Sequence, residues 1–266
     1  EKILRELQLR EYTDGSHDVD HFKRVTHRAL RFNKQGGLGG DPFIIVAAGL
    51  LHDMVEVPKN SPNRSKASRM SADAAVEFLQ SIAFPSQLLP DIHHAIEAHS
   101  FTANITPRTA EAKCIQDADR VEALGALGIA RCLYTSGRMG GNIVNWGDPL
   151  AKKRSLDDKQ WALDHFEVKL FHLPEMMKTD QGRIRAESLR SFMKEYRGKL
   201  MDGGPQSPEY DFARRCAEAG SDSLKDGGNE SLVDWLLLNM SSMDSKMMYF
   251  INQLKNELGS ELRKTG

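Results

Sequence analysis

Residues 41–53 read DPFIIVAAGLLHD, an apolar run that ends on a histidine and an aspartate side by side. The apolar run by itself is compatible with either a buried strand or a buried helix. Asp41 followed by Pro42 favours the helix, because aspartate is a preferred N-cap residue and proline is preferred at the first helical position. We therefore expect an almost wholly buried helix with His52 and Asp53 on its last turns.

The two polar residues at the end of this helix require a partner, because an unpaired charge in a buried position is costly. Adjacent side chains on a helix diverge by about 100°, so His52 and Asp53 can meet only on something that lies over the edge between them. A divalent cation is a natural candidate. A single His-Asp step is more commonly a hydrogen-bonded core pair, so the choice depends on whether further ligand types occur elsewhere.

The rest of the chain has the periodicity of helices. Apolar residues recur three and four positions apart in Phe22-Val25-Ala29-Phe32 and in Ala72-Ala75-Val76-Leu79, as one buried helix face requires. Alternating strand patterns are hard to find. Segments rich in glycine and proline separate the periodic stretches, and we expect about eight to ten helices in an all-α fold.

Composition limits the class of protein. A chain of 266 residues with 40% hydrophobic residues can bury one sizeable core. The net charge of -1 provides no sequence-wide positive field, which argues against a nucleic-acid partner. No apolar run approaches the ~18–20 residues of a membrane span, and the first residues, EKILRELQLREY, do not resemble a signal peptide. The three cysteines form no CxxC pair. We therefore expect a cytoplasmic protein without a membrane partner.

Further metal-ligand residue types occur in several motifs. The motifs are HDVDHFKRV (17–25), LLHD (50–53), IEAHSF (96–101), CIQDADRVEALGALG (114–128) and DHFEVKLFHLPEMMKTDQGR (164–183). Together these motifs resemble the HD-domain superfamily of metal-dependent phosphohydrolases, and more narrowly the small bacterial proteins of the YedJ type. The resemblance covers roughly residues 12–200 and includes several motifs in the family's order.

The resemblance implies that His21, His52, Asp53 and Asp119 are the metal ligands. Two imidazoles and two carboxylates form a mixed set suited to Mn, Fe, Ni, Co, Zn or Mg as the divalent metal cofactor. Asp117 competes with Asp119, because residues two apart on a helix face nearly opposite sides. We choose Asp119 because the family's ligand lies in the Ala-Asp step, and Asp117 then either accepts a hydrogen bond from a ligand imidazole or is solvated.

Five further residues are candidates for catalysis. Glu56 lies four residues after His52 and could deprotonate the attacking water if the helix continues that far; otherwise it is a surface carboxylate. The resemblance also implies that His17 and His99 face the pocket. Arg24 and Lys169 could contact a phosphate, although salt bridges are the alternative for both.

These expectations lead to a specific function. An all-α HD-domain helical bundle would hydrolyse a small phosphorylated substrate, a nucleotide by analogy, through attack of a metal-activated water. The alternative is a non-catalytic HD module that binds or senses a nucleotide with a structural metal. A di-iron oxygenase, as in other HD relatives, would need more histidine and carboxylate ligands than we can assign.

The C-terminal part of the chain lies outside the resemblance. We expect residues 1–203 to form the HD domain and residues 204–266 to form a helical extension after the DGGPQSP break. The apolar block Trp235-Leu236-Leu237-Leu238 is too apolar for a free helix. These C-terminal helices should therefore pack on the HD domain or on a second copy of the chain, which would give a homo-oligomer.

Overall fold

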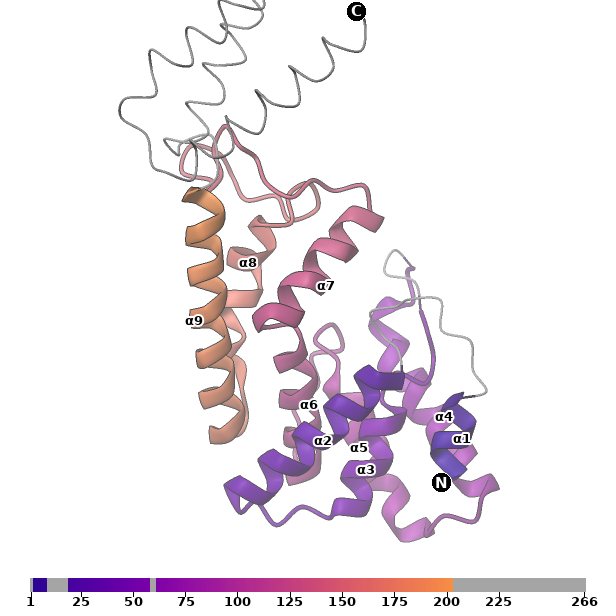
Figure 1. Ribbon diagram of the computed structural model, residues 1–266. Helices are drawn as coiled ribbons and strands as arrows, with labels where there is room; N and C mark the ends of the chain where they lie inside the picture. Colours follow the sequence, from indigo (N-terminus) through magenta and orange to yellow (C-terminus); the bar gives the residue numbers. More distant parts are fainter. Residues whose placement is uncertain (1, 9–18, 58–60, 203–266) are drawn as a thin grey trace, which may run out of the picture. The chain divides into compact units, whose positions relative to one another are not determined.

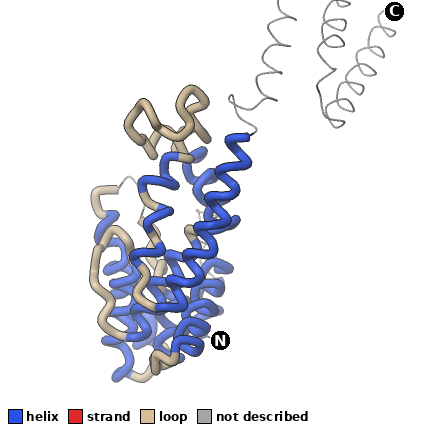
Figure 2. The backbone as a smooth tube through the Cα atoms, turned by 90° about the vertical axis from the view of Figure 1, so that its left-hand side faces the viewer, coloured by secondary structure: helices blue, strands red, loops and turns tan. Residues whose placement is uncertain are grey.

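The computed structural model describes residues 2–8, 19–57 and 61–202, and this part of the chain is helical (Figure 1). Helices and loops make up these residues, and none of them forms a β-strand (Figure 2). The all-α prediction is therefore confirmed. The α-helices are α1 (Lys2–Gln8), α2 (Val19–Gly36), α3 (Pro42–Leu51), α4 (Ala67–Ser81), α5 (Leu89–His99), α6 (Ala110–Glu122), α7 (Gly125–Arg138), α8 (Asp164–Val168) and α9 (Asp180–Asp202).

Short 3-10 helices connect several of these elements: η1 (Arg64–Lys66), η2 (Ser86–Leu88), η3 (Leu170–His172) and η4 (Pro174–Met176). The long segment between α7 and α8 is irregular and contains one isolated bridge, between Asn142 and Trp161. None of the described helices combines the length and the apolar composition that a membrane crossing requires.

The core lies between α2, α3, α5 and α6. Helix α2 packs against α3 and α6, and α5 packs against α3, α4 and α6. The predicted apolar stripes form the contacts between these helices, because a helix buries the face on which residues three and four apart recur. The fully buried residues of this core include Phe22, Val25, Ala29, Ile45, Leu51, Ile92, Ile96, Ile115 and Ala118.

Helix α3 begins as the sequence predicts. The Asp41 carboxylate accepts a hydrogen bond from the Phe43 amide at 2.8 Å, and Pro42 occupies the first helical position. The helix ends earlier than expected, because Leu51 is its last residue and His52 is the C-cap, whereas the prediction placed both His52 and Asp53 on its last turns. His52 and Asp53 therefore lie in the turn that follows the helix, and His52 still has helical backbone angles.

Helices α2 and α3 approach closely at Gly49. A Cβ atom on Gly49 would lie 2.5 Å from Thr26 Oγ1 and 3.0 Å from Thr26 Cα. We expect Gly49→Ala to reduce the free energy of unfolding by about 1–3 kcal/mol, because overpacking forces two backbones apart. Gly137→Ala is the control, since a Cβ there meets nothing within 4 Å. Urea unfolding of both variants measures the difference, and equal stability would contradict a tight α2–α3 contact.

The first compact unit of the chain spans Glu1–Gly198 and contains the core described above. The predicted extension, residues 204–266, lies outside the described residues. The division of the chain at residue 203 therefore stays a prediction.

Candidate metal centre

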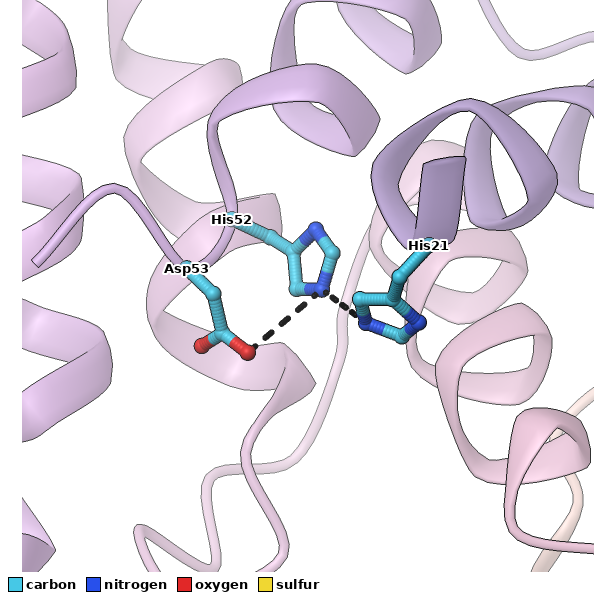
Figure 3. Close-up of side chains that lie close together, drawn as sticks. All are labelled: His21, His52 and Asp53. Carbon is cyan, nitrogen blue, oxygen red and sulfur yellow. Dashed lines mark hydrogen bonds and ion pairs between the residues drawn. The ribbon is translucent and has the colours of Figure 1, made fainter. Parts of the chain in front are cut away.

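Two buried imidazoles from different helices face each other. His21 lies in the first turn of α2 and His52 follows α3, and their Nε2 atoms are 3.3 Å apart (Figure 3). The Nδ1 atom of His52 lies 2.9 Å from the Gly49 carbonyl oxygen, which can only accept, so Nδ1 carries the proton and Nε2 presents a lone pair. Burial lowers the pKa of His52 to about 4, so this imidazole is neutral at neutral pH.

Two carboxylates lie beside this pair of Nε2 atoms. Asp53 Oδ2 is 3.7 Å from His52 Nε2. Asp119, on α6, places Oδ1 3.5 Å from His21 Nε2 and 3.9 Å from His52 Nε2. Burial by itself would raise the pKa of Asp119, but the neighbouring histidines bring it below its ordinary value. Asp119 is therefore an ionised carboxylate that faces both imidazoles.

His99 lies at the same place, as the resemblance implies. It is the last residue of α5, and its Nε2 is 3.4 Å from Asp53 Oδ1. Its Nδ1 lies 2.6 Å from the Ile96 carbonyl oxygen, and its ring packs edge-on against His52 with the centroids 4.8 Å apart. Burial would lower the pKa of His99, but the contact with Asp53 raises it above its ordinary value. His99 therefore holds the Asp53 carboxylate beside the imidazole pair.

The donor set fits a divalent cation. Ligand atoms of His21, His52 and Asp53 all lie within 4.8 Å of one another, and Asp119 adds a second carboxylate oxygen. The two Nε2 atoms lie within hydrogen-bond distance of each other, and two carboxylates add negative charge beside them. A cation between these atoms would offset the negative charge of the carboxylates and accept a lone pair from each imidazole. Such a mixed nitrogen and oxygen set suits a divalent first-row transition metal.

Asp117 has a role that the sequence did not indicate. Its Oδ2 accepts hydrogen bonds from the Thr179 amide at 2.7 Å and from the Thr179 hydroxyl at 2.8 Å, and the Lys178 amide also donates to this carboxylate. Asp117 is fully buried. Both interpretations of Asp117, as a partner of a ligand imidazole and as a solvated charge, are therefore wrong. It anchors the segment that leads into α9.

Glu56 lies outside helix α3. Because α3 ends at Leu51, Glu56 lies in the irregular segment after the helix and not one turn beyond His52 on the same face. Its side chain is exposed. The predicted contact of Glu56 with the attacking water stays a prediction, without the helix geometry that motivated it. His17 lies outside the described residues.

Arg24 is paired with a carboxylate that the sequence analysis missed. Its Nε donates to Glu122 Oε2 at 2.9 Å, and Arg28 forms a second ion pair with the same carboxylate. Burial alone would raise the pKa of Glu122, but contacts with His21, Arg28 and Arg24 bring it far below its ordinary value. A sequence signal existed, since Glu122 follows Asp119 by three positions and so shares its helix face.

Lys169 lies in a cationic group near Asp119. Its Nζ is 4.4 Å from the centroid of the Phe101 ring, and Arg120 Cζ is 5.6 Å from the same centroid. Burial lowers the pKa of Lys169, whereas the charge of Asp119 opposes this shift. Arg120 and Phe101 had no predicted role, although Arg120 directly follows Asp119 and Phe101 lies two residues after His99. The cations offer a place for a negatively charged group close to the candidate carboxylate and imidazole ligands.

The other histidines of α5 have structural partners. His93 Nε2 lies 2.9 Å from Asp73 Oδ1, and His94 Nε2 accepts a hydrogen bond from the Arg108 amide at 3.0 Å. Neither His93 nor His94 belongs to the group of His21, His52 and Asp53, whose ligand atoms are close enough to share a metal ion.

Comparison with known proteins agrees with this geometry. The family model of the HD domain matches residues 18–124, a range that includes all four candidate ligands. The uncharacterized protein YpgQ of Bacillus subtilis is 30% identical over 190 residues, which are 69% of this chain and 83% of YpgQ. The chain belongs to the HD-domain superfamily. It is a metal-dependent phosphohydrolase by this membership, and the HD-domain prediction is confirmed.

Solved structures of HD proteins share the fold. The crystal structure of YpgQ in complex with ADP is 29% identical, covers 77% of this chain and 97% of YpgQ, and superimposes with a TM-score of 0.59. An HD-superfamily hydrolase of Bacillus thuringiensis is 26% identical, covers 76% of this chain and 96% of that protein, and has a TM-score of 0.55. The superfamily's helical bundle therefore extends over three quarters of the chain.

Proposed function

We propose that this enzyme hydrolyses a phosphorylated nucleotide with a divalent metal ion held by His21, His52, Asp53 and Asp119. The convergence of His21 Nε2, His52 Nε2 and Asp119 Oδ1, with separations of 3.3–3.9 Å, carries this proposal. When bound, such a metal supplies a water of lowered pKa and polarises a phosphoryl oxygen.

The remaining residues of the site position the reactants. His99 keeps the Asp53 carboxylate oriented through the 3.4 Å contact. Lys169 binds the phosphoryl oxygens and stabilises their charge as it develops. Glu56 assists the water in this scheme, and His17 faces the pocket, as the resemblance implies.

Two observations support a nucleotide as the substrate. The relative YpgQ was crystallised with ADP. In this chain, Lys169 and Arg120 provide positive charge beside the proposed ligand Asp119. A phosphorylated substrate requires such cations close to the metal.

The proposal is tested by metal analysis of the purified full chain, followed by a phosphate-release screen over nucleoside mono-, di- and triphosphates. We expect about one divalent ion per chain, since we propose one set of four ligands among the described residues. We also expect release of phosphate or diphosphate that chelation abolishes and added metal restores. Bound metal without hydrolysis of any nucleotide would favour the alternative of a non-catalytic module. A spectroscopic di-iron signature would favour the oxygenase.

The C-terminal extension is proposed to lie outside the catalytic unit. Every residue assigned to the site precedes residue 170, and residues 204–266 contain no catalytic motif. Oligomer formation through this extension is part of the same proposal.

A further inference from the structure

Glu122 is a buried carboxylate directly behind the proposed metal ligands. It is the last residue of α6, and its side chain has no exposure to solvent. Three groups from α2 surround it: Arg24 Nε at 2.9 Å, the Arg28 guanidinium, and His21 Nδ1 at 3.5 Å. A buried carboxylate is retained only where paired charges offset its desolvation. Arg24 and Arg28 provide that pairing.

The two nitrogens of His21 face different neighbours. Its Nε2 faces His52 and Asp119, whereas its Nδ1 faces Glu122 Oε2. A metal-binding imidazole must present one unprotonated nitrogen, and the hydrogen bond at the other nitrogen decides which one that is. An ionised carboxylate can only accept a hydrogen bond, so a hydrogen bond from His21 to Glu122 would require the proton on Nδ1.

His52 is held in a different way. Its Nδ1 lies 2.9 Å from the Gly49 carbonyl oxygen, a neutral acceptor within its own turn. The acceptor behind His21 is instead a full negative charge from another helix, which makes the imidazole a stronger ligand. The 3.5 Å separation between His21 Nδ1 and Glu122 is long for a hydrogen bond, and such contacts often shorten when the site is filled.

We propose that Glu122, held in place by Arg24 and Arg28, is a positioning residue that fixes the tautomer and ring orientation of His21 for metal binding. This inference rests on the proposed metal site. It also gives Arg24 a different role from the predicted phosphate contact, because the Arg24 guanidinium acts on the metal through Glu122 and His21. Arg24 and His21 lie on α2 and Glu122 lies on α6, so the packing of α2 against α6 determines these contacts.

The experiment compares Glu122→Gln with Asp117→Asn in the full chain. Glutamine keeps the shape of Glu122 but removes the charge, and we expect the Kd for Mn²⁺ to rise about 10–100-fold. Asp117→Asn is the matched control, since it neutralises another buried carboxylate of α6 whose partners are Lys178 and Thr179. We expect this control to lose stability and to keep the Mn²⁺ affinity of the wild type.

A second readout is independent of metal. Nitrogen NMR of the metal-free protein reports the tautomer of His21, and we expect the Nδ1-protonated form in the wild type and a larger Nε2-protonated fraction in Glu122→Gln. If Glu122→Gln does not fold, Arg24→Met replaces it, because the Arg24 side chain is 40% exposed and Arg28 still pairs with Glu122 in that variant. Arg24→Met is expected to weaken Mn²⁺ binding several-fold.

Three outcomes would overturn the inference. They are an unchanged Mn²⁺ affinity in Glu122→Gln, an equal loss of affinity in Asp117→Asn, and an unchanged His21 tautomer. Failure of the proposed function is distinguishable from these outcomes. In that case the wild type itself would bind no metal, while the NMR measurement would still report whether Glu122 controls His21.

Discussion

His52→Ala is expected to lose bound metal and hydrolytic activity together. The His52 Nε2 atom lies within 3.3–3.9 Å of His21 Nε2, Asp53 Oδ2 and Asp119 Oδ1. The substitution therefore removes the proposed ligand that lies next to all three of the others. The loss of affinity should exceed the roughly 10–100-fold that removal of an outer partner costs. Folding should also weaken in metal-containing buffer, because metal binding to the native state contributes to its stability.

Elemental analysis and phosphate release on the same preparation measure both effects of His52→Ala. His94→Ala is the control, since His94 is also a buried histidine but accepts a hydrogen bond from the Arg108 amide and takes no part in the ligand set. We expect His94→Ala to keep its metal. Full metal occupancy in His52→Ala would end the assignment of this residue as a ligand.

Lys169→Met is expected to keep the metal and to lower kcat by about 10²–10³-fold. Removal of a single group that stabilises developing charge has an effect of this size. Methionine preserves apolar contact with Phe101, whose ring centroid lies 4.4 Å from Lys169 Nζ, and removes the charge alone. The change therefore separates electrostatic loss from loss of packing.

Lys194→Met provides the comparison for Lys169→Met. Lys194 Nζ also lies over an aromatic ring, 5.7 Å from the Phe171 centroid, but none of the proposed ligands is its partner in that contact. Steady-state kinetics with the nucleotide found in the screen should show a lowered kcat for Lys169→Met and wild-type values for Lys194→Met. Equal activity of the two variants would place Lys169 outside the reaction.

Local sequence patterns were sufficient to predict much of the fold. Asp41 and Pro42 predicted the start of α3, and the Phe22-Val25-Ala29-Phe32 stripe predicted the buried face of α2. Such features depend on neighbours within a few positions, so they are visible in a sequence. The end of α3 was not visible, because Leu51, His52 and Asp53 carry no glycine or proline that would mark a helix terminus.

The candidate site was also predictable only in part from the sequence. The types and order of the proposed ligands His21, His52, Asp53 and Asp119 could be predicted, since ligand chemistry belongs to side-chain type and the motifs occur in the family's order. The choice between Asp117 and Asp119 could not be made from periodicity, because both flank the same apolar stripe. Only the position of the 178–179 segment showed that Asp117 is an anchor of the fold.

The sequence by itself determined the all-α fold that the described residues adopt, the start of its central buried helix, and a set of candidate nitrogen and oxygen ligands that are far apart in the chain. Tertiary structure alone decided that His21 and His52 face each other at 3.3 Å and that Glu122 lies behind His21. The physical reason is that these contacts join residues 31 and 101 positions apart (52 minus 21, and 122 minus 21). Such contacts depend on how α2 packs against α3 and α6, and no local pattern encodes the relative rotation of packed helices.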